Sequence, residues 1–200
     1  MSIIPRMPSL PPVRPLPLSA AARSTALSSP PKHLAFNDTE INRTGVSVFM
    51  TEQQARENEL RGTQAAIEDA GALGVMTAFN RVGITAANAH TGLLKNILRG
   101  EWDFKGLESQ DFIMNPNYAV LKEYALNGGT MTTFTGENTM AAVSEKFAYW
   151  TTENVGQDTE LMSAIKQAMT WQAYALANSN ALDGIASSTR LVSVRTWYDN

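Results

Sequence analysis

From residue 32 onward, short apolar runs alternate with longer amphipathic stretches. Short apolar runs predict buried strands, and apolar residues at helical spacing predict helices with one buried face. Four strands are predicted, at 33–36, 75–79, 106–112 and 130–134. Helices are predicted at 51–70, 93–102, 118–126, 140–150 and 161–178. This alternation indicates βαβ units and a parallel sheet, and therefore an α/β fold.

Capping residues indicate where three of these helices begin or end. Thr51 stands before the first helix with Gln54 three positions later, the pattern of a capping box. His90 precedes the second helix, where an N-terminal capping role is the simplest interpretation. Asn127-Gly128-Gly129 is typical of a helix C-terminus, because glycine accepts the left-handed backbone found there.

About four βα units would form half of a TIM-type (βα) barrel, or a small doubly wound sheet, and pattern alone does not choose between them. Four strands rolled as in a barrel leave two unpaired edges, which favours a homo-oligomer. A monomer whose helix at 161–178 folds across the open face is the alternative.

Composition separates the first 31 residues from the rest. Residues 1–31 contain eight of the nine Pro, three Arg and no acidic residue. Pro at this density disfavours both helix and central strand, so we expect a disordered leader followed by one domain at 32–200. An organelle transit peptide is the alternative interpretation.

Charge and rare residues exclude several functions. The chain has a formal charge of −3, two His and no Cys, so disulfides, thiolate metal sites and a Cys nucleophile are excluded. No metal or cofactor is expected, because zinc ligands are too few and phosphate-binding glycine motifs are absent. The charge gives no reason to expect a nucleic-acid partner, and no apolar run is long enough to span a membrane. The cellular compartment stays open.

Polar residues at the strands suggest where chemistry could occur. Side chains at the carboxyl ends of parallel strands face the ligand in such folds. Asp111 closes the third strand and is the strongest candidate, although it could instead cap the next helix. Phe79 and Asn80 end the second strand. Lys32 and His33, at the first strand, could bind hydroxyls or a carboxylate, or could be a solvated pair.

Several segments resemble glycoside hydrolase family 3. KHLAFNDTEINR (32–43) resembles the family's K-H-F-x-x-N-x-x-E-x-x-R stretch, and TEQQARENEL (51–60) resembles the helix that follows it. VMTAFNRVG (75–83) and LLKNILRGEWDFKGLESQDF (93–112) are similar to two further segments, the second of which includes the specific pattern L-R-x-E-W-x-F-x-G. With ALANSNALDGI (175–185), the resemblance covers about residues 31–198.

The resemblance implies a function and a set of site residues. It implies that Asp111 is the nucleophile of a retaining β-glycosidase, which attacks the anomeric carbon of a carbohydrate substrate. The residues that it implies for substrate binding are Lys32, His33, Arg43, Phe79 and Phe112. We therefore expect a β-glycosidase-like hydrolase acting on β-glucosides or related β-glycosides.

The sequence also departs from the family pattern. Glu108 and Gln110 replace apolar or small residues in a strand that is normally buried on both faces. Glu59, Gly62 and Met131 replace the usual Tyr, Pro and Asp. No residue matches the general acid/base, and the first half of the barrel has no counterpart before Lys32. A truncated, weakly active enzyme is therefore one hypothesis, and a non-catalytic sugar-binding or self-associating module is the alternative. An unrelated chemistry on a rebuilt half-barrel is a third.

Overall fold

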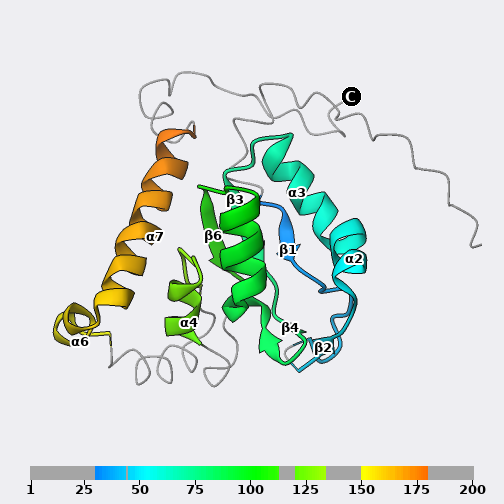
Figure 1. Ribbon diagram of the computed structural model, residues 1–200, viewed down its shortest axis with the longest axis horizontal. Coiled ribbons are helices and arrows are strands. Elements are labelled where there is room, and N and C mark those ends of the chain that lie inside the picture. The colour runs from blue at the N-terminus through cyan, green and yellow to red at the C-terminus, as the bar shows by residue number, and fades with distance from the viewer. Residues whose placement is uncertain (1–29, 44, 113–119, 134–149, 180–200) are drawn as a thin grey trace, which may run out of the picture.

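The computed structural model describes residues 30–43, 45–112, 120–133 and 150–179 (Figure 1). Residues 1–29 of the predicted leader lie outside the described residues. The helix predicted at 140–150 also lies outside them, except for its last residue. In the part of the chain that the structure describes, no helix is both long and apolar enough to cross a membrane.

The centre of the fold is a parallel sheet of three strands. These are β1 (Lys32–Leu34), β3 (Gly74–Thr77) and β6 (Leu107–Gln110), in the order β1-β3-β6. Thr77 pairs with Gln110 on one side and with Leu34 on the other. Three of the four predicted strands are thus confirmed, and their carboxyl ends lie at one edge of the sheet.

The fourth predicted strand, at 130–134, is wrong for the residues described there. Only one bridge forms, between Ser109 and Met131. Side chains take up the backbone groups that would extend it: Gln172 donates to the Thr130 carbonyl, and the Thr133 hydroxyl donates to the Gln110 carbonyl. The predicted pattern of four strands is therefore reduced to three strands and an isolated bridge among the described residues.

A second sheet, which the sequence did not predict, follows the loop after β1. It consists of β2 (Ser47–Val48), β4 (Arg81–Val82) and β5 (Thr85–Ala86). Strands of two residues are too short to show an alternating pattern. The turn between β4 and β5 uses Gly83 with a φ of 61°, a left-handed conformation that glycine adopts without strain.

The helix predicted at 51–70 is present as three consecutive segments, α2 (Glu52–Gln54), η1 (Ala55–Glu59) and α3 (Leu60–Glu68). The capping box at Thr51 is confirmed, because its hydroxyl accepts from the Gln54 N–H and the Gln54 side chain accepts from the Thr51 N–H. The middle segment is a π-helix, in which the Leu60 N–H donates to the Ala55 carbonyl. This wider turn explains why the apolar residues fit helical spacing only loosely.

Two further helices follow the strands as predicted. After the short 3₁₀ turn η2 (Ala87–Ala89), η3 (Gly92–Glu101) covers the sheet, and α4 (Leu121–Leu126) occupies the third predicted position. The Nδ1 atom of His90 accepts the Leu93 N–H at 3.0 Å, so the predicted capping role is confirmed. The predicted C-terminus of α4 is also confirmed, with Gly128 at a φ of 99°.

The last two helices are α6 (Thr152–Gln157), which was not predicted, and α7 (Thr159–Ala177), which was. Asp158 caps α7 by accepting the Leu161 N–H at 3.0 Å. Figure 1 shows α7 beside α4, on the β6 side of the molecule, and it contacts both elements.

The segment between η3 and β6, which carries the most specific family motif, packs into the core. Trp102 and Phe104 are buried there, next to Leu98 near the end of η3. A Cβ atom at Gly106 would lie 2.4 Å from the Leu73 carbonyl oxygen, so only glycine fits at that position. This segment therefore fixes helix η3 against the sheet.

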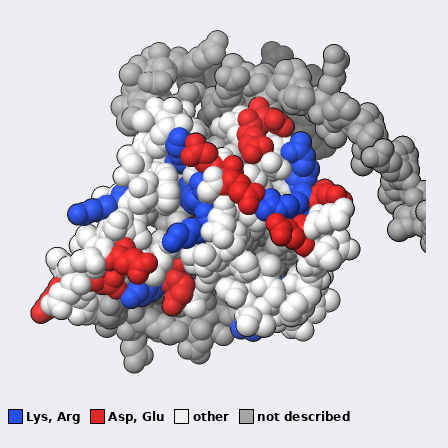
Figure 2. Space-filling model, viewed as in Figure 1, with Lys and Arg blue, Asp and Glu red and all other residues white. Residues whose placement is uncertain are grey.

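Charged side chains of both signs are interspersed on the face shown in Figure 2. Ion pairs among the described residues include Lys122–Asp158 at 2.7 Å and Lys105–Asp103 at 2.8 Å. Among the described residues on this face, neither sign forms a broad patch.

Candidate active site

Asp111 lies directly after β6, at the edge where the parallel strands end. Its N–H donates to the Thr77 carbonyl at 3.1 Å, which continues the pairing with β3 by one residue. The side chain is 6% exposed, and its Oδ1 atom accepts the Phe112 N–H at 2.8 Å. The other carboxylate oxygen, Oδ2, is directed at two donors from distant parts of the chain.

His33 is the first of these donors. It lies on β1, and its Nε2 atom is 3.2 Å from Oδ2 of Asp111. Burial lowers the pKa of His33 below its usual 6.5, against the raising effect of Asp111, and the nearby charges of Lys32 and Arg43 lower it further. The imidazole is therefore neutral at pH 7 and acts as a hydrogen-bond donor.

Arg43 is the second donor, and it comes from the loop between β1 and β2. Its Nη1 atom is 3.3 Å from Oδ2 of Asp111, and its Nε atom is 3.3 Å from a carboxylate oxygen of Glu40. The guanidinium lies over the Phe79 ring, 4.7 Å from its centroid. Two carboxylates and one aromatic face thus hold this cation in place.

The structure brings together four of the six predicted site residues, namely His33, Arg43, Phe79 and Asp111, which we call the Asp111 cluster. Lys32 is exposed and acts on His33 through its charge. Phe112 is 47% exposed, and its N–H holds Asp111. The cluster combines a carboxylate, which can stabilise a positive charge, with cationic and imidazole N–H donors, which can bind hydroxyl oxygens.

Two contacting residues received no role from the sequence. Asn37 lies 3.4 Å from His33, and Glu40 pairs with Arg43. Both occupy fixed positions of the K-H-F-x-x-N-x-x-E-x-x-R stretch, so the motif itself held the signal. Asn80, three residues after β3, is 1% exposed, and its Oδ1 atom is buried without a hydrogen-bond partner among the described residues.

A second polar group lies behind the same strand. Glu108 is completely buried, and its Oε1 accepts the Thr77 hydroxyl at 2.9 Å. Its Oε2 has no hydrogen-bond partner among the described residues. Burial raises the pKa of Glu108 to about 7, although hydrogen bonding to Tyr124 and the charge of Arg99 act in the opposite direction. We call Thr77, Arg99, Glu108 and Tyr124 the Glu108 cluster.

Arg99 supplies the positive charge of the Glu108 cluster and ties two loops together. It donates to the carbonyls of Phe104, Gly106 and Gly128 at 2.8–3.0 Å. Its guanidinium also stacks 3.8 Å from the centroid of Trp171 on α7. Burial lowers the pKa of Arg99 to about 10, so it stays charged at neutral pH.

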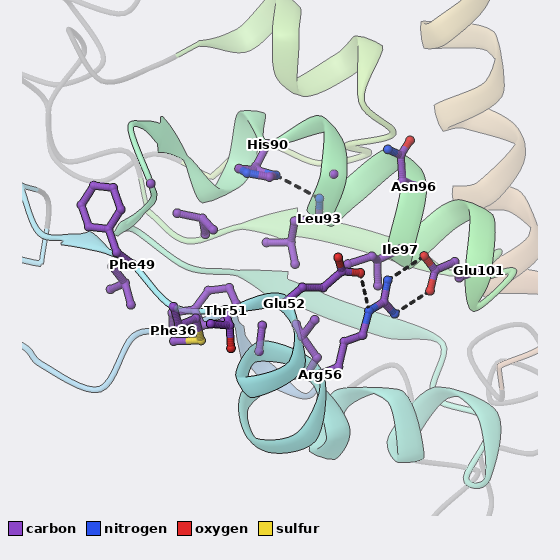
Figure 3. Close-up of a pocket in the computed structure, with 17 residues that line it drawn as sticks. Phe36, Phe49, Thr51, Glu52, Arg56, His90, Leu93, Asn96, Ile97 and Glu101 are labelled. Carbon is purple, nitrogen blue, oxygen red and sulfur yellow. Dashed lines mark hydrogen bonds and ion pairs between the residues drawn. The ribbon is translucent and has the colours of Figure 1, made fainter. Parts of the chain in front are cut away.

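A cavity of about 530 Å³ lies elsewhere, between the α2–η1 segment and η3 (Figure 3). It shares no residue with the Asp111 cluster. Its charged groups satisfy one another, because Arg56 pairs with Glu52 at 2.8 Å and with Glu101 at 2.7 Å. The Nδ1 atom of His90 is also occupied by its capping bond. The cavity is a gap between packed helices, so we place the candidate site at the Asp111 cluster.

Metal binding has no support among the residues that the structure describes, where no group of three His, Asp or Glu side chains could hold an ion.

Comparison with protein families matches residues 23–127 to the "Glycosyl hydrolase family 3 N terminal domain". Beta-glucosidase B of Emericella nidulans is 42% identical over 81 residues, which are 40% of this chain and 10% of that protein. Probable beta-glucosidase K of the same organism is 38% identical over 91 residues, 46% of this chain and 11% of that protein. The matched part of the chain thus spans about a tenth of the length of these relatives.

Solved structures of the same kind resemble the fold. Beta-glucosidase 3B from Thermotoga neapolitana, solved in complex with glucose, matches 76% of this chain and 21% of its own, with a TM-score of 0.62 and 22% identity. Beta-glucosidase from Kluyveromyces marxianus, also in complex with glucose, matches 74% of this chain and 18% of its own, with a TM-score of 0.51 and 27% identity. The fold is thus a mixed α/β arrangement with parallel strands like theirs.

Proposed function

The chain belongs to glycosyl hydrolase family 3, and on that premise we propose that the Asp111 cluster is part of a β-glycosidase site. In this proposal Asp111 is the nucleophile, and the substrates are β-glucosides or related β-glycosides. His33, Arg43, Lys32, Phe79 and Phe112 form the sugar-binding surroundings. The observation that carries the proposal is the contact of His33 and Arg43 with one oxygen of a nearly buried carboxylate.

The geometry of Asp111 suits nucleophilic attack. The Phe112 N–H holds one carboxylate oxygen, while the second faces the donors. In the first step, an oxygen of Asp111 bonds to the anomeric carbon and the bond to the leaving group breaks, so a glycosyl ester forms. A guanidinium has five N–H donors, and the contacts of Arg43 with Glu40 and Asp111 engage only two of them. Its other donors are suited to sugar hydroxyls.

A retaining mechanism also needs a second carboxyl group about 5–5.5 Å from the first, as acid and base. The test should therefore report on attack by Asp111 without requiring that acid. A 2-deoxy-2-fluoro-β-glucoside with a dinitrophenolate leaving group meets this need, because the phenolate departs unprotonated. We expect mass spectrometry of the intact chain, followed by peptide mapping, to find a fluoroglucosyl adduct on Asp111.

Matched variants separate labelling of Asp111 as the nucleophile from the effect of an Asp→Asn change elsewhere in the chain. Asp111→Asn should form no adduct, whereas Asp103→Asn, the same chemical change at an exposed ion pair, should label like the unchanged chain. Absence of the adduct from the unchanged chain would contradict the nucleophile assignment. A glucose titration followed by NMR then decides the alternative, because saturable binding without labelling identifies a non-catalytic sugar-binding module.

We also propose that the sheet β1-β3-β6 is part of a TIM-type barrel, within a domain at 32–200, and that the chain self-associates. The parallel order and the helices between the strands support the barrel. Among the described residues β1 pairs on one side only, which leaves an edge to be covered. Sedimentation equilibrium at micromolar concentration tests the assembly, and a single species at 21.8 kDa would contradict it.

A further inference from the structure

Three side chains form a line of contacts through the Asp111 cluster. The Nδ2 atom of Asn37 lies 3.4 Å from Nδ1 of His33, and Nε2 on the other side of the same ring lies 3.2 Å from Oδ2 of Asp111. Asn37 and His33 are four residues apart, and Asp111 comes from a different strand. Each ring nitrogen of His33 therefore has one partner, and the two partners differ in what they can donate.

The partner of Nε2 decides where the ring proton lies. A carboxylate only accepts hydrogen bonds, so a bare Nε2 facing Asp111 would set two lone pairs against each other. Nε2 must therefore carry the proton. Because burial keeps the imidazole neutral at pH 7, the ring has one N–H, and Nδ1 is an acceptor. Only the amide group of Asn37, and not its carbonyl oxygen, can satisfy that acceptor.

We propose that Asn37 is a positioning residue that holds His33 in the Nε2–H tautomer, with this donor aimed at Asp111. The Oδ1 atom of Asn37 has no hydrogen-bond partner among the described residues, so the amide nitrogen makes the contact described here. The tautomer is a property of the free chain. Its use in sugar binding rests on the proposed function, where a fixed N–H donor would meet either the Asp111 carboxylate or a hydroxyl close to it.

The two histidines of the chain make the tautomer directly measurable. Ring ¹⁵N chemical shifts distinguish an N–H nitrogen from an acceptor nitrogen, and the chain contains only His33 and His90. His90 is an internal reference, because its Nδ1 accepts the Leu93 N–H and its tautomer is thus independently fixed. In the unchanged chain without sugar, we expect both rings to show an Nε2–H and an acceptor Nδ1.

Substitution of Asn37 should change His33 in a graded way. Asn37→Asp replaces the donor by a carboxylate, which favours a second ring proton, so we expect the pKa of His33 to rise by at least about one unit. Asn37→Leu removes the donor without adding charge, so we expect a smaller rise and a shift of the Nδ1 signal alone. Charges already near the ring are Asp111, Lys32, Arg43 and Glu40, and neither variant alters them.

Controls separate this effect from others. Asn154→Asp makes the same charge change on exposed α6 and should leave both rings unchanged. The His90 signals should not move in either Asn37 variant. An Nδ1–H tautomer at His33 in the unchanged chain would overturn the inference even if both variants fail to fold. So would an unchanged pKa in a folded Asn37→Asp variant. Failure of sugar binding or labelling would instead count against the proposed function.

Discussion

Two carboxylates three residues apart, Glu108 within β6 and Asp111 directly after it, occupy opposite environments. Asp111 accepts from a backbone N–H and faces both an imidazole and a guanidinium. Glu108 is fully buried, and one of its oxygens has no hydrogen-bond partner. The first is surrounded by donors at the edge where the parallel strands end, whereas the second is enclosed between the sheet and its helices.

The contrast shows that burial and convergent donors single out different carboxylates. The raised pKa belongs to Glu108, because loss of solvent disfavours its charged form. Asp111, the nucleophile of the proposed function, instead has three convergent donors, the Phe112 N–H, His33 and Arg43. A raised carboxyl pKa therefore marks the Glu108 cluster, whereas convergent hydrogen-bond donors mark the Asp111 cluster.

Removal of Arg99 should have the largest effect on stability. Arg99→Met keeps much of the apolar stem but leaves three carbonyls without their donor and the Glu108 carboxyl without a nearby cation. We expect the free energy of unfolding to fall by about 3 kcal/mol, as for other broken partly buried charge networks. Urea unfolding followed by circular dichroism measures it. A loss below about 1 kcal/mol would show that the Glu108 cluster is not structural.

Ionisation of Glu108 should make stability depend on pH. Its folded-state pKa of about 7 exceeds the usual 4.5, so the unfolded chain releases this proton first. The free energy of unfolding should therefore decline as pH rises from about 4.5 to about 7, by about 3 kcal/mol, and then level off. Glu108→Gln should remove this decline.

An exposed matched variant, Glu68→Gln, should retain the decline of the unchanged chain. Urea midpoints at pH 5 and pH 8 are sufficient to compare the three proteins. Equal declines in the unchanged chain and in Glu108→Gln would show that Glu108 is ionised in the folded protein at both pH values.

Asp111→Asn should produce a smaller change in stability, of less than about 1 kcal/mol. Arg43 keeps its contacts with Glu40 and Phe79, and the Asn side-chain oxygen can still accept the Phe112 N–H. Site residues are commonly replaceable in this way because their arrangement serves the ligand rather than the fold. Thermal unfolding measures the change, and a large loss would assign Asp111 a structural role.

The smallest expected effect is on the titration of His33. Asp111 raises the pKa of His33, so Asp111→Asn should lower it further below 6.5 while leaving His90 unchanged. Protonation of His33 then becomes more costly, and the imidazole stays neutral to lower pH. An NMR titration of the two rings gives the shift, and an increase would mean that the two groups are not in contact.

The sequence predicted elements where local rules dominate. The capping box at Thr51, the cap at His90 and the glycine turn after α4 depend on residues within one turn of each other, and all three are confirmed. The strand predicted at 130–134 was wrong for the described residues, where side chains take backbone acceptors: the Thr133 hydroxyl donates to the Gln110 carbonyl of β6, and Gln172 on α7 donates to the Thr130 carbonyl. Such competition is invisible in a local pattern.

The candidate site likewise depends on contacts between residues that are distant in the sequence. Arg43 and Asp111 are 68 positions apart, and only the resemblance to a family placed them in one site. Glu108 and Gln110 depart visibly from the family pattern, but the sequence does not indicate their hydrogen-bond partners. Gln110 accepts from the Asn88 amide at 2.7 Å, and Glu108 accepts from Thr77. The most specific motif, L-R-x-E-W-x-F-x-G, serves packing, since its Arg99 binds carbonyls and its Gly106 permits close approach.

The alternation of polar partners along β6 also limits how that strand can align. Its side chains point in turn to the helix-covered face and to the opposite face, so a slip of one residue would exchange the two sets. Glu108 would leave the Thr77 hydroxyl, and Asp111 would leave His33 and Arg43. Gln110 would likewise leave the Asn88 amide. The polar residues that make β6 an unusual buried strand therefore favour one register of β6 against β3.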